Sequence, residues 1–293
     1  MNTDTNTPLS APTDRIRARQ PWNGVTPTAL KNAKQSLDTH GFVVLEGFLK
    51  PEDLSPIHDA IRALISARRE QVGLRPVRSD MRFDDGLMEL ATRRRQDVGP
   101  IYDACRRLIA VHRLAAREDF EAISRHLMGT QNVMLHREKQ VRIDLPRETK
   151  FLFDWHQDFP YAQDSEDALV YWIPLHAVDE TNGCLKVRPG SHRLGVQSTL
   201  LNTAYASDAS KSKSHAIELT GESAFAFPEI AVPMNAGDVL VIHTLVVHKS
   251  GQNLSDRARW TAMARHANFD DKWAVQNGWP SGIADEKTAT KET

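Results

Sequence analysis

The side chains best suited to chemistry in this sequence are His156 and Asp158, in the segment Asp154 to Pro160. On a strand, successive side chains point to opposite faces, so this pair would share one face while Gln157 points away. Imidazole and carboxylate groups both bind metals, and two ligands on one face leave the other side of a metal open. A histidine near an aspartate is more often a plain hydrogen-bonded pair, and this alternative stays open without a third ligand.

The third ligand must come from far along the chain, and His248 is the best candidate. Residues 239–248 are expected to form one strand, and His248 lies where that strand runs into a polar loop. Alternation puts His243 on the opposite face, where we interpret it as a hydrogen-bonded core residue. His192 and His266 are the next alternatives. Two histidines and one carboxylate form the facial triad of non-haem Fe(II) oxygenases. The predicted triad consists of His156, Asp158 and His248.

Arg259, eleven residues after His248, begins the next expected strand. A guanidinium is a natural partner for a carboxylate, because its planar fork donates two parallel charge-assisted hydrogen bonds. In an Fe(II) oxygenase that uses 2-oxoglutarate, the keto-acid end of this cosubstrate binds iron and its distant carboxylate needs a cation. Arg259 is a candidate for that role, although most arginines form surface salt bridges. Arg257 follows a turn directly and is expected to be exposed.

The elements that must position these residues change in character along the chain. Residues 26–130 show mostly helical periodicity, starting with Thr26 as an N-cap before Pro27, and Pro100 is expected to break the helical stretch once. From 131 to 270 many short strand-like segments follow one another, which is typical of a sandwich or a double-sheet jelly roll. The expected strands are residues 132–135, 140–145, 150–158, 168–176, 184–188, 224–227, 231–233, 239–248 and 259–267.

We therefore expect one domain over residues 26–280, with a helical part followed by a β-rich core. Residues 1–25 are expected to be disordered or loosely attached, and 281–293 to form a loose tail. Residues 195–222 interrupt the strands with a Ser/Thr/Lys-rich stretch and are candidates for a lid.

Composition excludes several classes of protein. The 293 residues contain 37 Lys and Arg against 38 Asp and Glu, so a net charge of -1 gives no reason to expect a nucleic-acid partner. The sequence has two cysteines and no CxxC motif, which fits a reducing compartment. Its polar start lacks the apolar region of a signal peptide, and no apolar run is long enough to span a membrane. We predict a cytoplasmic protein without a membrane partner.

Four motifs in this sequence together resemble the phytanoyl-CoA dioxygenase family. They are His156-Gln157-Asp158, the segment 183–192, Gly237-Asp238, and residues 248–255 followed by Arg259, and they occur in the family's order. The resemblance covers roughly residues 40 to 267. It implies a mainly β fold with flanking helices, built on a double-stranded β-helix (a cupin-type jelly roll). It also implies Fe(II), 2-oxoglutarate and O2 as cofactor and cosubstrates.

Residue by residue, the resemblance implies that the predicted triad binds iron and that Arg259 binds the distal carboxylate of 2-oxoglutarate. Ser250 is the implied hydroxyl partner of that carboxylate. Arg142 lies in the region that touches the cosubstrate in this family, where lysine or threonine is more usual. The turn at 189–192 is interpreted as structural.

The implied activity is hydroxylation of an unactivated C–H bond with release of succinate and CO2. Related halogenases replace the carboxylate ligand by a small residue, so Asp158 predicts hydroxylation instead of halogenation. Desaturation, epimerisation and ring formation stay open, and so does the oligomeric state. Polar loops favour a small polar metabolite as substrate. Candidate substrate contacts are Trp155, Phe159, Trp172 and Arg188.

Two other functions are compatible with the sequence. One is a non-catalytic jelly-roll binding or sensing protein, against which the three ligands and Arg259 argue, because a binding protein gains nothing from a cosubstrate clamp. The other is a cupin-type metalloenzyme that does not use 2-oxoglutarate. Cupins usually place more histidines around the metal than the two well-placed ones found here.

Overall fold

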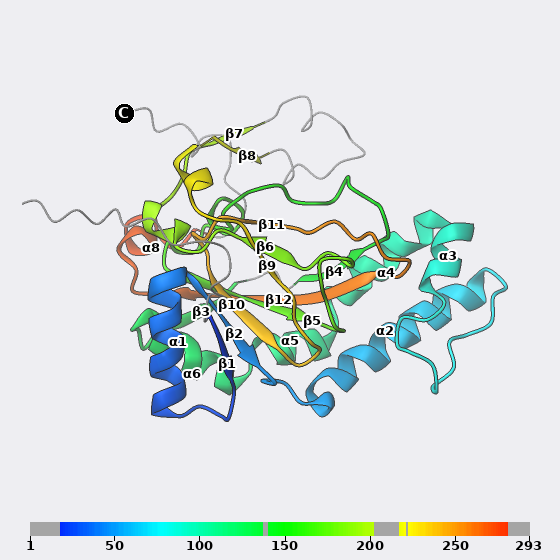
Figure 1. Ribbon diagram of the computed structural model, residues 1–293. Coiled ribbons are helices and arrows are strands. Elements are labelled where there is room, and N and C mark those ends of the chain that lie inside the picture. Colours follow the sequence, from blue (N-terminus) through cyan, green and yellow to red (C-terminus); the bar gives the residue numbers. More distant parts are fainter. Residues whose placement is uncertain (1–17, 137–139, 202–216, 221, 281–293) are drawn as a thin grey trace, which may run out of the picture.

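The computed structural model describes residues 18–136, 140–201, 217–220 and 222–280. These residues form three layers: a set of helices, a large sheet, and a small sheet on the opposite face of the large one (Figure 1). One apolar core lies between the helices and the large sheet. A second lies between the two sheets, and the candidate site belongs to this inner space.

The large sheet has the strand order β1-β2-β10-β5-β12-β3, and β4 also pairs with β12. Its strands run antiparallel except for the parallel pair β1 and β2. Their bounds are Arg19–Pro21 for β1, Phe42–Glu46 for β2, Val133–Leu135 for β3, Gln140–Asp144 for β4, Ala168–Pro174 for β5, Val239–His243 for β10 and Arg259–Asn268 for β12.

The small sheet has the order β11-β6-β9, with bounds His248–Lys249, Leu185–Val187 and Ile230–Val232. A separate pair joins β7 (Thr199–Leu201) and β8 (Ile217–Leu219). The predicted lid, residues 195–222, contains this pair, but residues 202–216 and 221 lie outside the described part of the chain.

The helices precede most of the strands, as their periodicity predicts. Thr26 accepts a hydrogen bond from the backbone N–H of Ala29 and begins α1, and Gly41 ends it in the left-handed conformation. The helices are α1 (Pro27–His40), α2 (Pro51–Gln71), α3 (Leu87–Arg93), α4 (Val98–Cys105), α5 (Ile109–Ala115), α6 (Glu118–Met128) and the late α8 (Lys272–Gln276).

Alternation along β12 determines which side chains reach the inner space. Trp260, Ala262 and Ala264 belong to the core beneath the helices. Arg259, Met263 and Arg265 point to the other face and line the cavity between the sheets. The strand thus separates an apolar face from one that carries two buried cations.

Two expected strands around the metal ligands are wrong in detail. Residues 150–158 form no regular strand, because their neighbour β11 is two residues long and only His156 makes a β-bridge with it. Residues 239–248 form two strands in different sheets, since the chain turns at Thr244 and Leu245 between β10 and β11. His243 and His248 therefore belong to different strands, and alternation along one strand does not set their relative directions.

Three further expectations need correction. Residues 224–227 were expected as a strand, but Glu222–Ala226 forms a 3-10 helix. Pro100 does not break a helix, because it lies in the first turn of α4, where the missing N–H costs nothing. The chain is attached before residue 26: Arg19–Pro21 pairs with β2, while residues 1–17 and 281–293 lie outside the described part.

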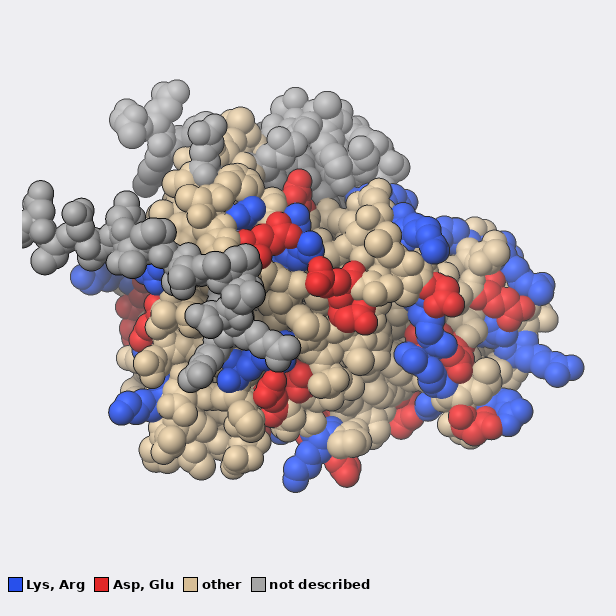
Figure 2. Space-filling view, in the orientation of Figure 1, with Lys and Arg blue, Asp and Glu red and all other residues tan. Residues whose placement is uncertain are grey.

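Acidic and basic side chains are interspersed over the described surface of the face in Figure 2. Among the described residues, every helix is too short or too polar to cross a lipid bilayer.

Candidate metal centre and its cavity

The three predicted ligands converge although they come from three different local structures. His156 lies in the isolated bridge, His248 opens β11, and Asp158 precedes a short 3-10 helix at Phe159–Tyr161. The two histidines exchange both backbone hydrogen bonds, each at 2.9 Å. One ligand atom from each of the three side chains lies within 4.8 Å of the others, and all three are buried.

Both imidazoles are oriented by carbonyl groups of their own segments. Nδ1 of His156 lies 2.6 Å from the carbonyl oxygen of Asp154, and Nδ1 of His248 lies 2.9 Å from that of Val246. A carbonyl only accepts, so each Nδ1 carries the proton and each Nε2 keeps its lone pair. Nε2 of His248 lies 3.6 Å from Oδ2 of Asp158, which is close for two groups that share a cation.

The electrostatics of the cluster favour the protonation states that bind a metal. Burial and the nearby His248 lower the pKa of His156 to about 3, so this imidazole is neutral at neutral pH. Burial opposes ionisation of Asp158, but Arg265, His248 and His156 together hold the pKa of its carboxyl below the usual range. Two imidazoles and one carboxylate are the donor set that Fe(II) takes in facial-triad sites, so these residues fit that ion.

Arg265 is the functional neighbour that sequence reasoning missed. Its Nη2 donates to Oδ1 of Asp158 at 3.0 Å, and the side chain is largely buried in the cavity wall. This contact leaves Oδ2 of the carboxylate facing His248. Nε of Arg265 is also buried, and it has no hydrogen-bond partner within the described part of the chain, so it is available to an oxygen of a bound ligand.

The other histidines considered from the sequence lie elsewhere. Nδ1 of His243 accepts from the backbone N–H of Leu245, and the ring lies near that of His192. Nε2 of His192 contacts the carbonyl oxygen of Asp38 at 3.2 Å. His266 points to the helix side of β12 and contacts Ser124 at 2.8 Å.

The metal cluster opens into a cavity of about 420 Å³ between the sheets, a size that suits a small organic ligand. The three ligands line it together with four other predicted residues, Arg142, Trp172, Ser250 and Arg259. The remaining predicted substrate contacts lie away from the cavity wall. Trp155 packs against the guanidinium of Arg188 at 4.2 Å, and Phe159 packs against Trp273. Their roles in substrate binding stay predictions.

Arg259 is 2% exposed and lines the end of the cavity that β4 and β12 form. Its Nη2 donates to Oδ2 of Asp144 at 2.7 Å, and its Nη1 donates to the carbonyl of Gly183 and, at 3.4 Å, to that of Gly251. Arg142 donates to the other oxygen of Asp144 at 2.8 Å. Two guanidiniums thus share one carboxylate, and this end of the cavity keeps an excess of one positive charge.

The glycines beside Arg259 explain two of the sequence motifs. A Cβ at Gly251 would lie 2.3 Å from the carbonyl oxygen of Cys184, and one at Gly183 would lie 2.6 Å from that of Gly251. Only glycine allows these two loops to approach so closely. The approach brings the carbonyls of Gly183 and Gly251 to the same guanidinium nitrogen, Nη1 of Arg259.

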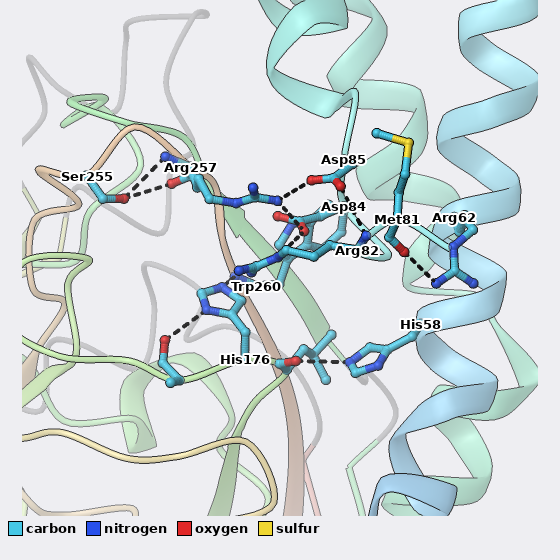
Figure 3. Close-up of polar contacts among 12 residues, drawn as sticks. His58, Arg62, Met81, Arg82, Asp84, Asp85, His176, Ser255, Arg257 and Trp260 are labelled. Carbon is cyan, nitrogen blue, oxygen red and sulfur yellow. Dashed lines mark hydrogen bonds and ion pairs between the residues drawn. The ribbon is translucent and has the colours of Figure 1, made fainter. Parts of the chain in front are cut away.

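A second polar cluster anchors the loop that leads into Arg259. Nη2 of Arg257 donates to Asp84 at 2.9 Å and to Asp85 at 2.6 Å, between the helical part and the loop before β12 (Figure 3). Arg257 was expected to be exposed, but its side chain is only 40% exposed, because Asp84 is buried beside it. Asn253 ties the same loop to the backbone of Asp144.

Comparison with known proteins places the chain in a family. The family model described as phytanoyl-CoA dioxygenase (PhyH) matches residues 37–261. The chain belongs to the phytanoyl-CoA dioxygenase family. A curated relative, phytanoyl-CoA dioxygenase domain-containing protein 1 of Bos taurus, is 38% identical over 106 residues. That match spans 36% of this chain and only 35% of the relative.

Solved structures share the fold of this phytanoyl-CoA dioxygenase family member at low sequence identity. The epimerase SnoN in complex with Fe3+, alpha ketoglutarate and nogalamycin RO has a TM-score of 0.56 and 18% identity, over 89% of this chain and 98% of that one. EctD from S. alaskensis, with 2-oxoglutarate and 5-hydroxyectoine, has a TM-score of 0.52 and 18% identity, over 93% and 90%. These likenesses show that the chain shares its fold with both proteins.

Proposed function

We propose that this protein is an Fe(II)- and 2-oxoglutarate-dependent dioxygenase that hydroxylates an unactivated C–H bond of a small polar metabolite and releases succinate and CO2. The observation that carries the proposal is the buried cluster of His156, Asp158 and His248 at the wall of a cavity whose β4–β12 end holds Arg259. Fe(II) with 2-oxoglutarate and O2 supplies the oxidising power that this reaction needs. We also infer that the two facing sheets form the cupin-type jelly roll.

The protein's own residues prepare the site for the metal and the cosubstrate. The backbone carbonyls of Asp154 and Val246 fix the imidazoles, and Arg265 fixes the carboxylate of Asp158, so the ligands need little reorganisation. Burial excludes water from all three ligands, which strengthens every electrostatic contact within the cavity.

For the cosubstrate, we assign Arg259 to the distal carboxylate of 2-oxoglutarate, with Ser250 and Arg142 beside it. The support is the surplus positive charge of Arg142 and Arg259 over Asp144, which one added carboxylate would neutralise. The Arg259 fork already donates to Asp144, so binding requires the two carboxylates to share it.

The deciding experiment is an anaerobic titration of Fe(II) and 2-oxoglutarate into metal-free protein, in wild type and His248→Ala. A visible metal-to-ligand charge-transfer band in the wild type that is lost in the variant is the expected result. Bound iron without the band would favour a cupin-type enzyme that does not use 2-oxoglutarate. Absence of iron binding would favour a binding or sensing protein.

The location in the cell and the partners are part of this proposal. Cys105 and Cys184 are both buried free thiols, which fits the cytoplasm. The volume of the cavity suits a small-molecule substrate, and the balance of 37 basic and 38 acidic residues gives no reason to expect a nucleic-acid partner.

A further inference from the structure

A second histidine–carboxylate pair lies at the edge of the cavity, apart from the three metal ligands. It consists of His136, which follows β3, and Asp164, in the turn after the 3-10 helix at Phe159–Tyr161. Nδ1 of His136 contacts Oδ2 of Asp164, and both side chains are buried. His136 lines the cavity, whereas Asp164 is not part of its wall, so the carboxylate lies behind the ring. Neither residue takes part in the proposed binding of metal or cosubstrate.

The sheet places His136 directly beside Arg265. The register of β3 and β12 sets these two residues opposite each other, and the backbone N–H of His136 donates to the carbonyl of Arg265 at 2.9 Å. Opposite residues of antiparallel strands have their side chains on the same face, with Cβ atoms about 5 Å apart. The two neighbours hold two aspartates of one loop, since Arg265 binds Asp158 and His136 binds Asp164. Arg265 thus links His136 to a metal ligand.

His136 is separate from the end of the cavity assigned to the cosubstrate. Arg259, Met263 and Arg265 point to the cavity from alternate positions of β12, so the apolar side chain of Met263 lies between the two arginines. Trp172 lies opposite Met263 on β5 and also lines the cavity. Arg259 and His136 therefore belong to different ends of an apolar floor, which leaves the His136 end for a substrate.

Asp164 determines which hydrogen bond His136 can make with a ligand. A carboxylate accepts from Nδ1–H of an imidazole and so fixes the tautomer, which leaves the lone pair of Nε2 to accept from a ligand. Nε2 of His136 has no hydrogen-bond partner in the part of the chain that the structure describes. The neighbouring guanidinium of Arg265 disfavours a cationic ammonium group as the donor. A neutral hydroxyl group meets both conditions.

We propose that His136, oriented by Asp164, binds a hydroxyl group of the substrate through Nε2. The inference rests on the proposed function for the reaction and adds that the substrate is an alcohol. The hydroxyl group would hold the substrate beside Arg265, so that a neighbouring C–H bond faces the metal ligands. His136 is thus a residue that determines specificity and positions the substrate.

The test compares three probes that share a six-membered ring: cyclohexanol, cyclohexanone and cyclohexylamine. Their binding to the protein with Fe(II) and 2-oxoglutarate is measured by calorimetry under argon. We expect cyclohexanol to bind about fivefold more tightly than cyclohexanone, which cannot donate a hydrogen bond, since one neutral hydrogen bond is worth about that factor. Cyclohexylamine is a cation at neutral pH and should bind more weakly than cyclohexanol. The inference would be overturned if the ketone or the amine bound as tightly as the alcohol, or if none of the probes bound.

Two variants and a matched control assign the preference to this pair. His136→Phe keeps an aromatic ring without the acceptor and should abolish the preference for the alcohol over the ketone. Asp164→Asn should reduce it, because an amide both donates and accepts and no longer fixes the tautomer. The control His266→Phe replaces a buried histidine on the opposite face of β12 and should leave the preference unchanged.

A preference that survives in His136→Phe, or that His266→Phe reduces as much, would also overturn the inference. The comparison of the three probes in the wild type does not depend on the folding of any variant.

The charge-transfer band of each protein is recorded in the same samples. A wild type that lacks the band but discriminates the probes through His136 would contradict the proposed reaction and support the hydroxyl site. A wild type that shows the band but does not discriminate the probes would do the reverse.

Discussion

Asp158 has two oxygens with different partners, and this division sets its geometry. Oδ1 accepts from Arg265 at 3.0 Å, while Oδ2 lies 3.6 Å from Nε2 of His248. A carboxylate held in this way offers a metal one oxygen in a fixed direction. Residues around a metal that orient its ligands typically change metal affinity or activity by about 10–100-fold when they are replaced.

Replacing Arg265 by Gln should therefore weaken Fe(II) binding by about tenfold or more. The variant loses the charged donor to Asp158, and the carboxylate gains rotational freedom in a buried site. Equilibrium binding of Fe(II) under argon measures the effect. Arg265→Lys keeps the positive charge but lacks the planar fork of the guanidinium. Its affinity for Fe(II) should therefore lie between that of the wild type and that of Arg265→Gln. Unchanged Fe(II) affinity in both variants would show that Asp158 is held by its backbone.

At the residue scale, the sequence was sufficient to predict which three side chains come together, but not the contacts that orient them. His156, Asp158 and His248 stand out because two histidines and one carboxylate are the residue types of a facial triad and because the motifs around them resemble one family. Arg265 was within reach, since it alternates in phase with Arg259 on the same strand. Its partner, Asp158, lies 107 positions away in the sequence, so no local pattern could predict the ion pair.

At the scale of elements, two strands that lie wholly within the large sheet were predicted closely, and the segments at the junction of the sheets were not. β5 and β12 lie within their expected ranges to a few residues. Residues 239–248 were expected to form one strand because they are mostly apolar and contain no glycine or proline, yet the chain on the two sides of the turn at Thr244 is buried in different sheets. Burial in two layers gives the same sequence pattern as burial in one.

The loop before β12 depends on an element of the helical part, and this dependence is testable. Arg257→Met should lower the free energy of unfolding by about 1–2 kcal/mol, because the buried carboxylate of Asp84 loses a charged donor. Urea unfolding measures it. The matched control is Arg78→Met, whose ion pair with Asp80 is exposed and should contribute less than about 0.5 kcal/mol. Equal losses in the two variants would contradict a structural role for Arg257.

At the scale of the whole molecule, the packed layers bury or partly bury histidines that come from a helix, from loops and from a strand of the large sheet. Burial lowers the pKa of His58, His176 and His266, and it lowers that of His192 to about 4. His266 shows why. Its Nε2 donates to the carbonyl of Ala115 at 2.8 Å and its Nδ1 faces Ser124, so the neutral ring is already satisfied.

These lowered pKa values predict that the metal-free protein loses stability as the pH falls below about 6.5, the pKa of histidine in an unfolded chain. Below this pH the histidines of the unfolded chain bind protons, while those of the folded protein stay neutral. For His192 this difference persists down to about pH 4. The carboxyls of Asp144 and Asp158 do not offset this loss, because their pKa values are lowered and they stay ionised in this range. Urea unfolding at pH 7.5 and 5.5 measures the difference in the free energy of unfolding between the two pH values.

The variant His266→Gln should make this difference smaller by up to about 1.4 kcal/mol per pH unit, because it removes one buried histidine. The control is His126→Gln, which replaces an exposed histidine on α6 and should leave the difference unchanged. Equal stability of the wild type at the two pH values would mean that these histidines take up protons as readily in the folded protein as in the unfolded chain.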